Sequence, residues 1–135
     1  HTRAEALIAA PADFLDAPTC LRLQQALMRQ VEQRNVLIET LPSSNVRISQ
    51  YQHVGEHHAL RWMRAPGHAQ EGDPEIMVCL GSDDPGIFAA DIESEFYLLH
   101  AALRKTGLSD ADALARLSAV NERGRTHRFH HPRLS

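Results

Sequence analysis

Two short apolar runs stand out along the chain and predict buried strands. Residues 76–80, Ile-Met-Val-Cys-Leu, contain no charge, which is typical of a strand covered on both faces, as in a parallel sheet. Residues 36–38, Val-Leu-Ile, predict a second and shorter strand of the same kind. The longer segments around them follow helical spacing instead, so the pattern alternates between the two kinds of element.

Helices are predicted on both sides of each strand. Cys20, Leu23, Leu27 and Val31 recur at spacings of three and four, which predicts a helix from about residue 18 to residue 34. Residues 54–64 predict another helix, with Leu60 on one face and Met63 or Arg64 on the other. The remaining predicted segments are a weak helix over 4–14, a surface loop over 65–75, a helix over 92–106 that Gly107 closes, and a helix from a capping box at 109–112 through Val120.

The order of elements is therefore helix, strand, helix, strand, helix, helix. Two strands cannot make a self-sufficient parallel sheet, because each central strand needs a neighbour on both sides. We therefore expect an α/β fold in which residues 1–135 form the C-terminal part of a TIM-like (β/α)8 barrel. Two parallel strands would each be followed by helices, with further C-terminal helices, and the remainder of the barrel would precede His1.

Composition narrows the class of protein. The net charge is -3 and no long basic run occurs, so nonspecific nucleic-acid binding has no electrostatic basis. No apolar stretch reaches the roughly 18 residues of a membrane-spanning helix, and no membrane partner is expected. Cys20 and Cys79 both lie in apolar patterns and are interpreted as reduced core residues of a cytoplasmic protein.

The most informative residues are Asp83 and Asp84, which follow the longer apolar run in the segment Gly-Ser-Asp-Asp-Pro. Two adjacent carboxylates at the end of a buried strand repel one another, and burial raises that cost. A metal ion or a polar ligand would offset it. At the C-terminal ends of barrel strands, such residues carry the chemistry. The alternative is an ordinary turn or helix cap, since acidic residues and proline are common in loops.

Two ordered motifs resemble the adenosine deaminase family. Residues 80–88, Leu-Gly-Ser-Asp-Asp-Pro-Gly-Ile-Phe, followed by the acidic and aromatic residues of 92–96, are similar to the family's Ser/Thr-Asp-Asp-Pro segment and the helix after it. Upstream, residues 39–45, Glu-Thr-Leu-Pro-Ser-Ser-Asn, resemble the family's Glu-x-Cys-Pro-x-Ser-Asn segment. Asn121 and Phe129 loosely match its closing region. The resemblance covers roughly residues 36–130.

The resemblance implies a zinc-containing barrel enzyme that hydrolytically deaminates adenine-type substrates. Asp83 matches the aspartate that ligates Zn2+ and orients the attacking water, and Asp84 matches the one that hydrogen-bonds the purine. Ser43, Ser44 and Asn45 would shape the neighbouring strand-end loop. Leu41 stands where the family has cysteine. His1 is the candidate for the family's histidine that serves as base or electrostatic stabiliser, and the alternative is a terminal histidine without a role.

The sequence leaves several functions open. The leading hypothesis is the C-terminal portion of a deaminase acting on an adenine nucleoside or nucleotide, with a weaker hint of an anti-phage defence enzyme; a homo-oligomer is compatible with it. A catalytically inactive deaminase-like domain used for assembly or nucleotide binding is the alternative, and an AMP deaminase-type substrate stays open. His57 and His58 are expected at the surface or in packing, because adjacent residues on a helix point apart.

Overall fold

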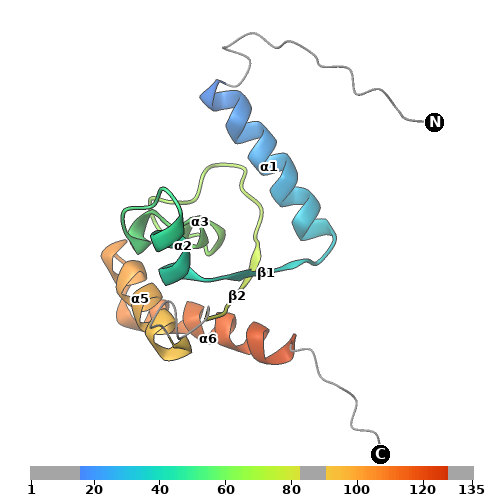
Figure 1. The fold of residues 1–135 in the computed structure, drawn as a ribbon. Coiled ribbons are helices and arrows are strands. Elements are labelled where there is room, and N and C mark those ends of the chain that lie inside the picture. The colour runs from blue at the N-terminus through green and yellow to red at the C-terminus, as the bar shows by residue number, and fades with distance from the viewer. Residues whose placement is uncertain (1–15, 83–90, 128–135) are drawn as a thin grey trace, which may run out of the picture.

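The chain forms an α/β fold with parallel strands that are each followed by helices (Figure 1). The computed structural model describes residues 16–82 and 91–127. The elements in chain order are α1 (Ala17–Gln33), β1 (Leu37–Thr40), α2 (Pro42–Ile48), the 3-10 helix η1 (Val54–Glu56), α3 (His58–Trp62), β2 (Met77–Leu80), α5 (Ile92–Lys105) and α6 (Asp110–Thr126). The predicted order of elements is therefore confirmed, with one additional short helix directly after β1.

Side-chain caps begin the three long helices. Asp16 accepts the backbone N–H of Thr19 at the start of α1, and Asp91 accepts that of Ser94 at the start of α5. Ser109 opens α6 in the same way, as the capping box predicts. These caps satisfy backbone donors that lack partners within the first turn. The capping residue directly before each long helix therefore determines where that helix starts.

The sheet has two strands in parallel register, with Leu37 opposite Met77 and Thr40 opposite Leu80. The ladder continues one residue further, because the Gly81 N–H donates to the Thr40 carbonyl at 3.0 Å. Parallel strands point the same way, so the segments that follow β1 and β2 leave from the same edge of the sheet. This edge, formed by the C-terminal ends of β1 and β2, is called the strand-end edge.

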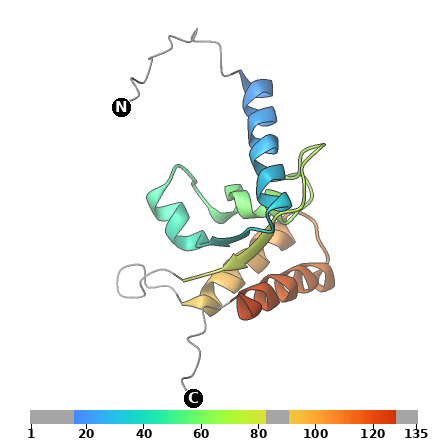
Figure 2. The ribbon, with the colours of Figure 1, turned by 90° about the vertical axis from the view of Figure 1, so that its right-hand side faces the viewer.

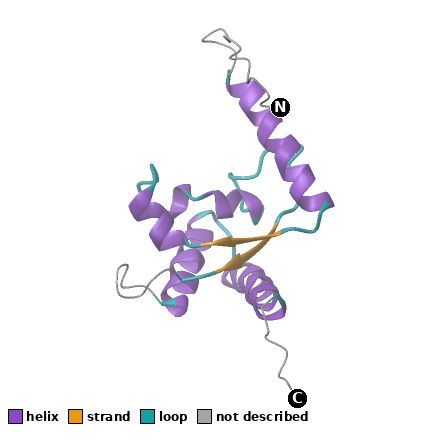
Figure 3. Cartoon of the chain, turned by 45° about the vertical axis from the view of Figure 1, so that its right-hand side comes forward, coloured by secondary structure: helices purple, strands orange, loops and turns teal. Residues whose placement is uncertain are grey.

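Helices cover the sheet from two sides. Figures 2 and 3 show α1 on one side of the strands and α6 on the other. The smaller of two apolar clusters joins Met28 of α1 to Ile76 and Val78, with Trp62 packed against it. The larger cluster joins α3, β2, α5 and α6. Its members are Leu60, Met63, Ala65, Leu80, Leu99, Ala102, Leu103, Ala113, Leu117 and Val120.

Two of the predicted helices differ from the structure. The helix expected over 54–64 is divided, because His57 has an extended backbone and caps α3. Leu60 and Met63 were expected on opposite faces, but both belong to the larger apolar cluster. The helix expected to end at Val120 continues to Thr126. The weak helix expected over 4–14 lies outside the described residues.

The buried face of α1 is also not the predicted stripe. Leu23 and Leu27 are 50% and 63% exposed, whereas Gln25 and Met28 are buried. The reason is the segment 65–75, which was predicted as a surface loop and instead packs on α1. Gln25 donates to the Glu71 carbonyl at 2.8 Å and to the Asp73 carboxylate at 3.2 Å. The buried hydrogen bonds of Gln25 therefore set which face of α1 packs against the segment 65–75.

The centre of that packing is a buried ion pair. Arg61 donates two hydrogen bonds to the Asp73 carboxylate, at 2.8 and 2.7 Å, and the Asp73 side chain is fully buried. These hydrogen bonds hold the pKa of Asp73 well below its usual value.

None of the helices within residues 16–82 and 91–127 has the length and the apolar composition that a membrane-spanning helix requires.

Candidate functional site at the strand-end edge

The two segments that carry the family resemblance begin side by side at the strand-end edge. Residues 41–45 follow Thr40 of β1, and Ser82 follows Gly81 next to β2. Asp83 and Asp84 come directly after Ser82 in the sequence, but both lie outside the described residues, as does His1. The metal, substrate and base roles expected for these three residues therefore stay predictions.

A cavity of about 580 Å3 opens at this edge between the sheet and the two C-terminal helices. Glu39 and Cys79 contribute to its wall from neighbouring strands, and Ser82 lies on its rim. Helix α5 contributes Phe96, and α6 contributes Asn121, a residue that the resemblance had singled out. The cavity therefore adjoins the point where the Asp-Asp segment begins.

The Glu39 carboxylate lies in the space beside Gly81. A Cβ atom added to Gly81 would collide with the Glu39 carboxylate and would lie 2.9 Å from the Leu41 side chain. Burial, together with the nearby charge of Glu39, raises the pKa of the Cys79 thiol. Cys79 is therefore a neutral thiol in the wall of the cavity, and neither Cys79 nor Cys20 is in a disulfide. The expected core position is confirmed for Cys79, whereas Cys20 is only partly buried.

A buried carboxylate joins the two motif segments. The Glu95 carboxylate on α5 accepts the Ser43 N–H at 3.0 Å and the Ser43 hydroxyl in a second hydrogen bond. Glu95 is only 1% exposed. Ser43 lies in the first turn of α2, where backbone N–H groups lack partners and a negative charge is favourable. Glu95 therefore fixes the segment after β1 against the helix that follows the Asp-Asp segment.

A second buried group, His57, fixes the same segment from its other end. The Ala59 N–H donates to His57 Nδ1 at 3.0 Å, so the ring proton is on Nε2. That Nε2–H donates to Asn45 Oδ1 at 3.0 Å, and Asn45 Oδ1 also accepts the Leu41 N–H at 3.3 Å. Thr40 Oγ1 lies 3.4 Å from Nε2. The histidine therefore orients the asparagine, which in turn holds the backbone where β1 ends.

Burial and, as a smaller contribution, the neighbouring His58 together lower the pKa of His57 to about 4. Its ring is thus neutral at physiological pH and acts through hydrogen bonding rather than charge. Next to it, Tyr51 and His58 contact each other through their rings and through a Tyr51 Oη–His58 Nδ1 hydrogen bond. The expectation of a surface or packing role is confirmed for both histidines.

The described residues do not form a metal site among themselves. No group of three or more His, Cys, Asp or Glu side chains in residues 16–82 and 91–127 lies close enough to hold one ion. Zinc sites in enzymes usually need three protein ligands. Zn2+ therefore fits this edge only if further ligands join the described residues. A scan against protein-family models gave no match to the chain.

Sequence reasoning named Glu95 within the motif and expected His57 at the surface or in packing, but it did not foresee that either residue holds the segment after β1. Glu95 had a visible signal, because it lies four residues before Leu99 and eight before Leu103 on a predicted core face. A carboxylate on such a face requires a buried partner. His57 had no comparable signal, since the helical pattern ran continuously through it.

Proposed function

We propose that this chain is the C-terminal portion of a TIM-like (β/α)8 barrel enzyme that hydrolytically deaminates an adenine nucleoside or nucleotide. One observation carries the proposal: the Pro-Ser-Ser-Asn segment follows β1, and Ser82, the first residue of Ser-Asp-Asp-Pro, follows Gly81 after β2 at the same edge, beside a cavity. Barrel enzymes place their chemistry at this edge of the sheet. The remaining strands of the barrel would pair with the two outer edges of β1 and β2.

Each residue has a separate task in the proposed reaction. Asp83 would ligate Zn2+, which when bound supplies an activated water for attack on the purine C6 carbon, with ammonia as the leaving group. Asp84 would accept a hydrogen bond from the purine, and His1 remains the candidate base or electrostatic stabiliser. The described residues contribute to the frame of the proposed site. Glu95 and His57 hold the segment after β1, and Phe96 offers an apolar wall to a ring.

The decisive experiment measures ammonia release by the whole protein with adenosine, AMP and ATP. Asp83→Ala is expected to abolish turnover and to lower zinc content, because a ligand carboxylate is lost. Glu93→Gln, on the exposed face of α5, is the matched carboxylate control and should leave both unchanged. Normal activity and normal zinc content in Asp83→Ala would overturn the assignment.

The second candidate is a deaminase-like domain that binds nucleotides without turning them over. The open cavity beside Ser82 is compatible with it, since binding requires no complete metal centre. Saturable binding of adenosine or AMP by the whole protein, without ammonia release and without bound zinc, would favour this function over catalysis.

A further inference from the structure

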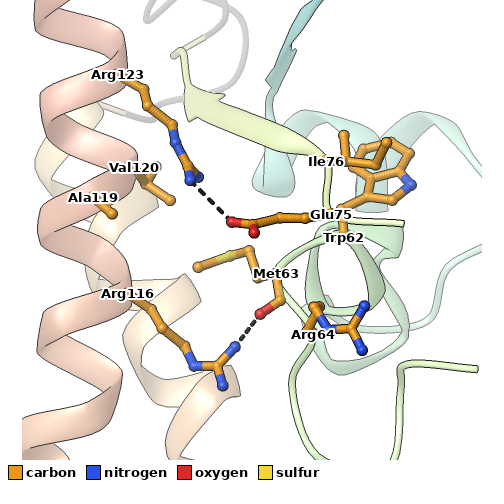
Figure 4. A pocket seen from close by; sticks show the side chains of 9 residues that line it. All are labelled: Trp62, Met63, Arg64, Glu75, Ile76, Arg116, Ala119, Val120 and Arg123. Atoms are coloured by element: carbon orange, nitrogen blue, oxygen red, sulfur yellow. Dashed lines mark hydrogen bonds and ion pairs between the residues drawn. The ribbon is translucent and has the colours of Figure 1, made fainter. Parts of the chain in front are cut away.

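A second cavity lies at the opposite end of β2 from the strand-end edge. It encloses about 310 Å3 between the end of α3, the residues just before β2, and α6 (Figure 4). Its apolar lining includes Met63, Ile76 and Val120, which are 9%, 1% and 0% exposed. Ile76 precedes the first residue of β2, whereas the strand-end cavity is lined by Leu80 and Ser82 at the other end of that strand. The two cavities adjoin at Val120 of α6, which lines both.

Three arginines line this cavity together with a single carboxylate. Arg116 and Arg123 lie seven residues apart on α6, two turns along one face, and Arg64 follows α3. The carboxylate is Glu75, from the segment that leads into β2. The chain as a whole carries a net charge of -3, so a local excess of positive charge is not a consequence of composition.

Two of the three guanidinium charges have no carboxylate partner among the lining residues. Arg116 donates to the Met63 carbonyl, and Arg64 donates to the Asp73 carbonyl at 2.7 Å. A carbonyl oxygen accepts a hydrogen bond but does not neutralise a charge. The carboxylate of Asp73 is already bound by Arg61. Each arginine has five N–H donors, so these contacts leave most of the donors of Arg116 and Arg64 available.

The third arginine has a weak partner. Arg123 Nη2 lies 3.4 Å from Glu75 Oε1, and the Glu75 side chain is 69% exposed. An exposed ion pair of this length contributes little, because water and salt compete for both groups. An incoming anion could therefore replace the Glu75 carboxylate at Arg123. Figure 4 shows Arg123 and Arg116 extending from the same helix, Arg123 toward Glu75 and Arg116 toward the Met63 carbonyl.

We propose that this cavity binds a phosphate-bearing small molecule. Guanidinium groups match the geometry of phosphate oxygens with paired hydrogen bonds, and a concave site with one sign of charge concentrates anions. Ala119 and the aliphatic parts of the arginine side chains give a base or another ring an exposed apolar surface to contact, while the guanidinium groups bind the phosphate. The site is separate from the proposed deaminase centre and does not depend on that function.

The test is a calorimetric titration of the whole protein with inorganic phosphate, AMP and adenosine, in the presence of a chelator. The chelator removes metal ions that would otherwise bind phosphate elsewhere. Inorganic phosphate and AMP are expected to bind and to weaken as salt is added. AMP binding that is tighter than phosphate binding and that Arg116→Gln weakens identifies a nucleotide as the ligand of this cavity, because AMP bound at the deaminase centre would not respond to that variant. Equal affinity identifies phosphate alone. Adenosine, which has no phosphate, reports the deaminase centre separately.

Arg116→Gln and Arg123→Gln are each expected to weaken phosphate binding by about ten-fold or more, because a charged hydrogen-bond donor is lost. Arg29→Gln, on the exposed side of α1, changes the net charge equally and should have no effect. Glu75→Gln should instead tighten binding several-fold, a gain that misfolding cannot imitate. The proposal is overturned if none of the phosphate compounds binds, or if the α6 variants bind them as the unaltered protein does.

Discussion

Glu95 and Ser43 are 52 positions apart in the sequence, yet the Glu95 carboxylate accepts both the backbone N–H and the hydroxyl of Ser43. The contact joins the helix after β2 to the helix after β1. A carboxylate with almost no exposed surface is stable only when hydrogen bonds replace its hydration. Glu95 and Ser43 therefore form a buried link across the strand-end edge.

Replacing Glu95 is expected to destabilise the fold. Glu95→Gln keeps the size of the side chain but removes the charge that favours the N-terminus of α2, so we expect a loss of about 1–3 kcal/mol in the free energy of unfolding. Urea denaturation followed by circular dichroism measures the change. Glu93→Gln, exposed on the same helix, should stay within about 0.5 kcal/mol of the unaltered chain. Equal losses in both variants would contradict the prediction.

His57 is expected to make stability depend on pH in the mildly acidic range. Its pKa is about 4 in the folded chain against 6.5 when unperturbed, so the unfolded state binds the proton first as the pH falls. The contribution of His57 is present above pH 6.5 and is lost as the pH falls through 4, by about 3 kcal/mol in total. Urea denaturation at a series of pH values tests this.

The variant His57→Gln separates this residue from other titrating groups. It should be less stable at pH 8, because the Asn45 hydrogen bond is weakened, and it should show a flatter pH dependence between 6.5 and 4. His53→Gln removes an exposed histidine and should keep the slope of the unaltered chain. An unchanged slope in His57→Gln would show that another group titrates there.

Asp73 is expected to act in a different pH range. Its folded pKa lies below the usual 3.8, so its contribution is present above pH 3.8 and is lost as the pH falls from there through the folded value. Asp73→Asn should cost about 3–5 kcal/mol at neutral pH, because Arg61 loses the partner of a buried ion pair. Glu71→Gln, an exposed neighbour, is the control for urea denaturation. A loss below 1 kcal/mol in Asp73→Asn would contradict the buried pair.

The two cysteines are expected to differ in reactivity. Cys79 is 7% exposed and its thiol pKa is raised, so little of the reactive thiolate forms. With iodoacetamide at pH 8, Cys79 should be alkylated roughly ten-fold or more slowly than the half-buried Cys20, as measured by peptide mass spectrometry. The difference should disappear in urea. Equal rates in the folded chain would show that the sheet opens at β2.

The sequence predicted correctly those elements that depend on residues close to them in the chain. The apolar run before Gly81 specified β2, and the Ser109 cap specified the start of α6, because strand burial and helix capping depend on neighbouring residues. The parallel sheet could be predicted for the same reason. The predicted buried face of α1 was wrong, because Gln25 is buried against Asp73, which is 48 positions away. The periodicity of α1 does not reveal such a distant contact.

The candidate site was predictable only in outline. The order of the two motif segments indicated one edge of a sheet, and the paired strands agree with that. The supporting contacts could not be read from the chain, because the partners of Ser43 and of Asn45 belong to other elements. Short α2 was missed because its seven residues carry no periodic signal and derive their stability from Glu95 and His57.

Helix α6 forms part of the wall of both cavities, and Val120 lines the two of them. The two cavities contact overlapping stretches of the chain, residues 116–123 for one and 120–127 for the other. A ligand that tilts α6 from one cavity would therefore reshape the other. Thermodynamic linkage makes such an effect reciprocal, so each ligand would alter the affinity of the other by the same factor. Binding in either cavity would therefore be sensed in the other through the C-terminal half of α6, which forms a wall of both.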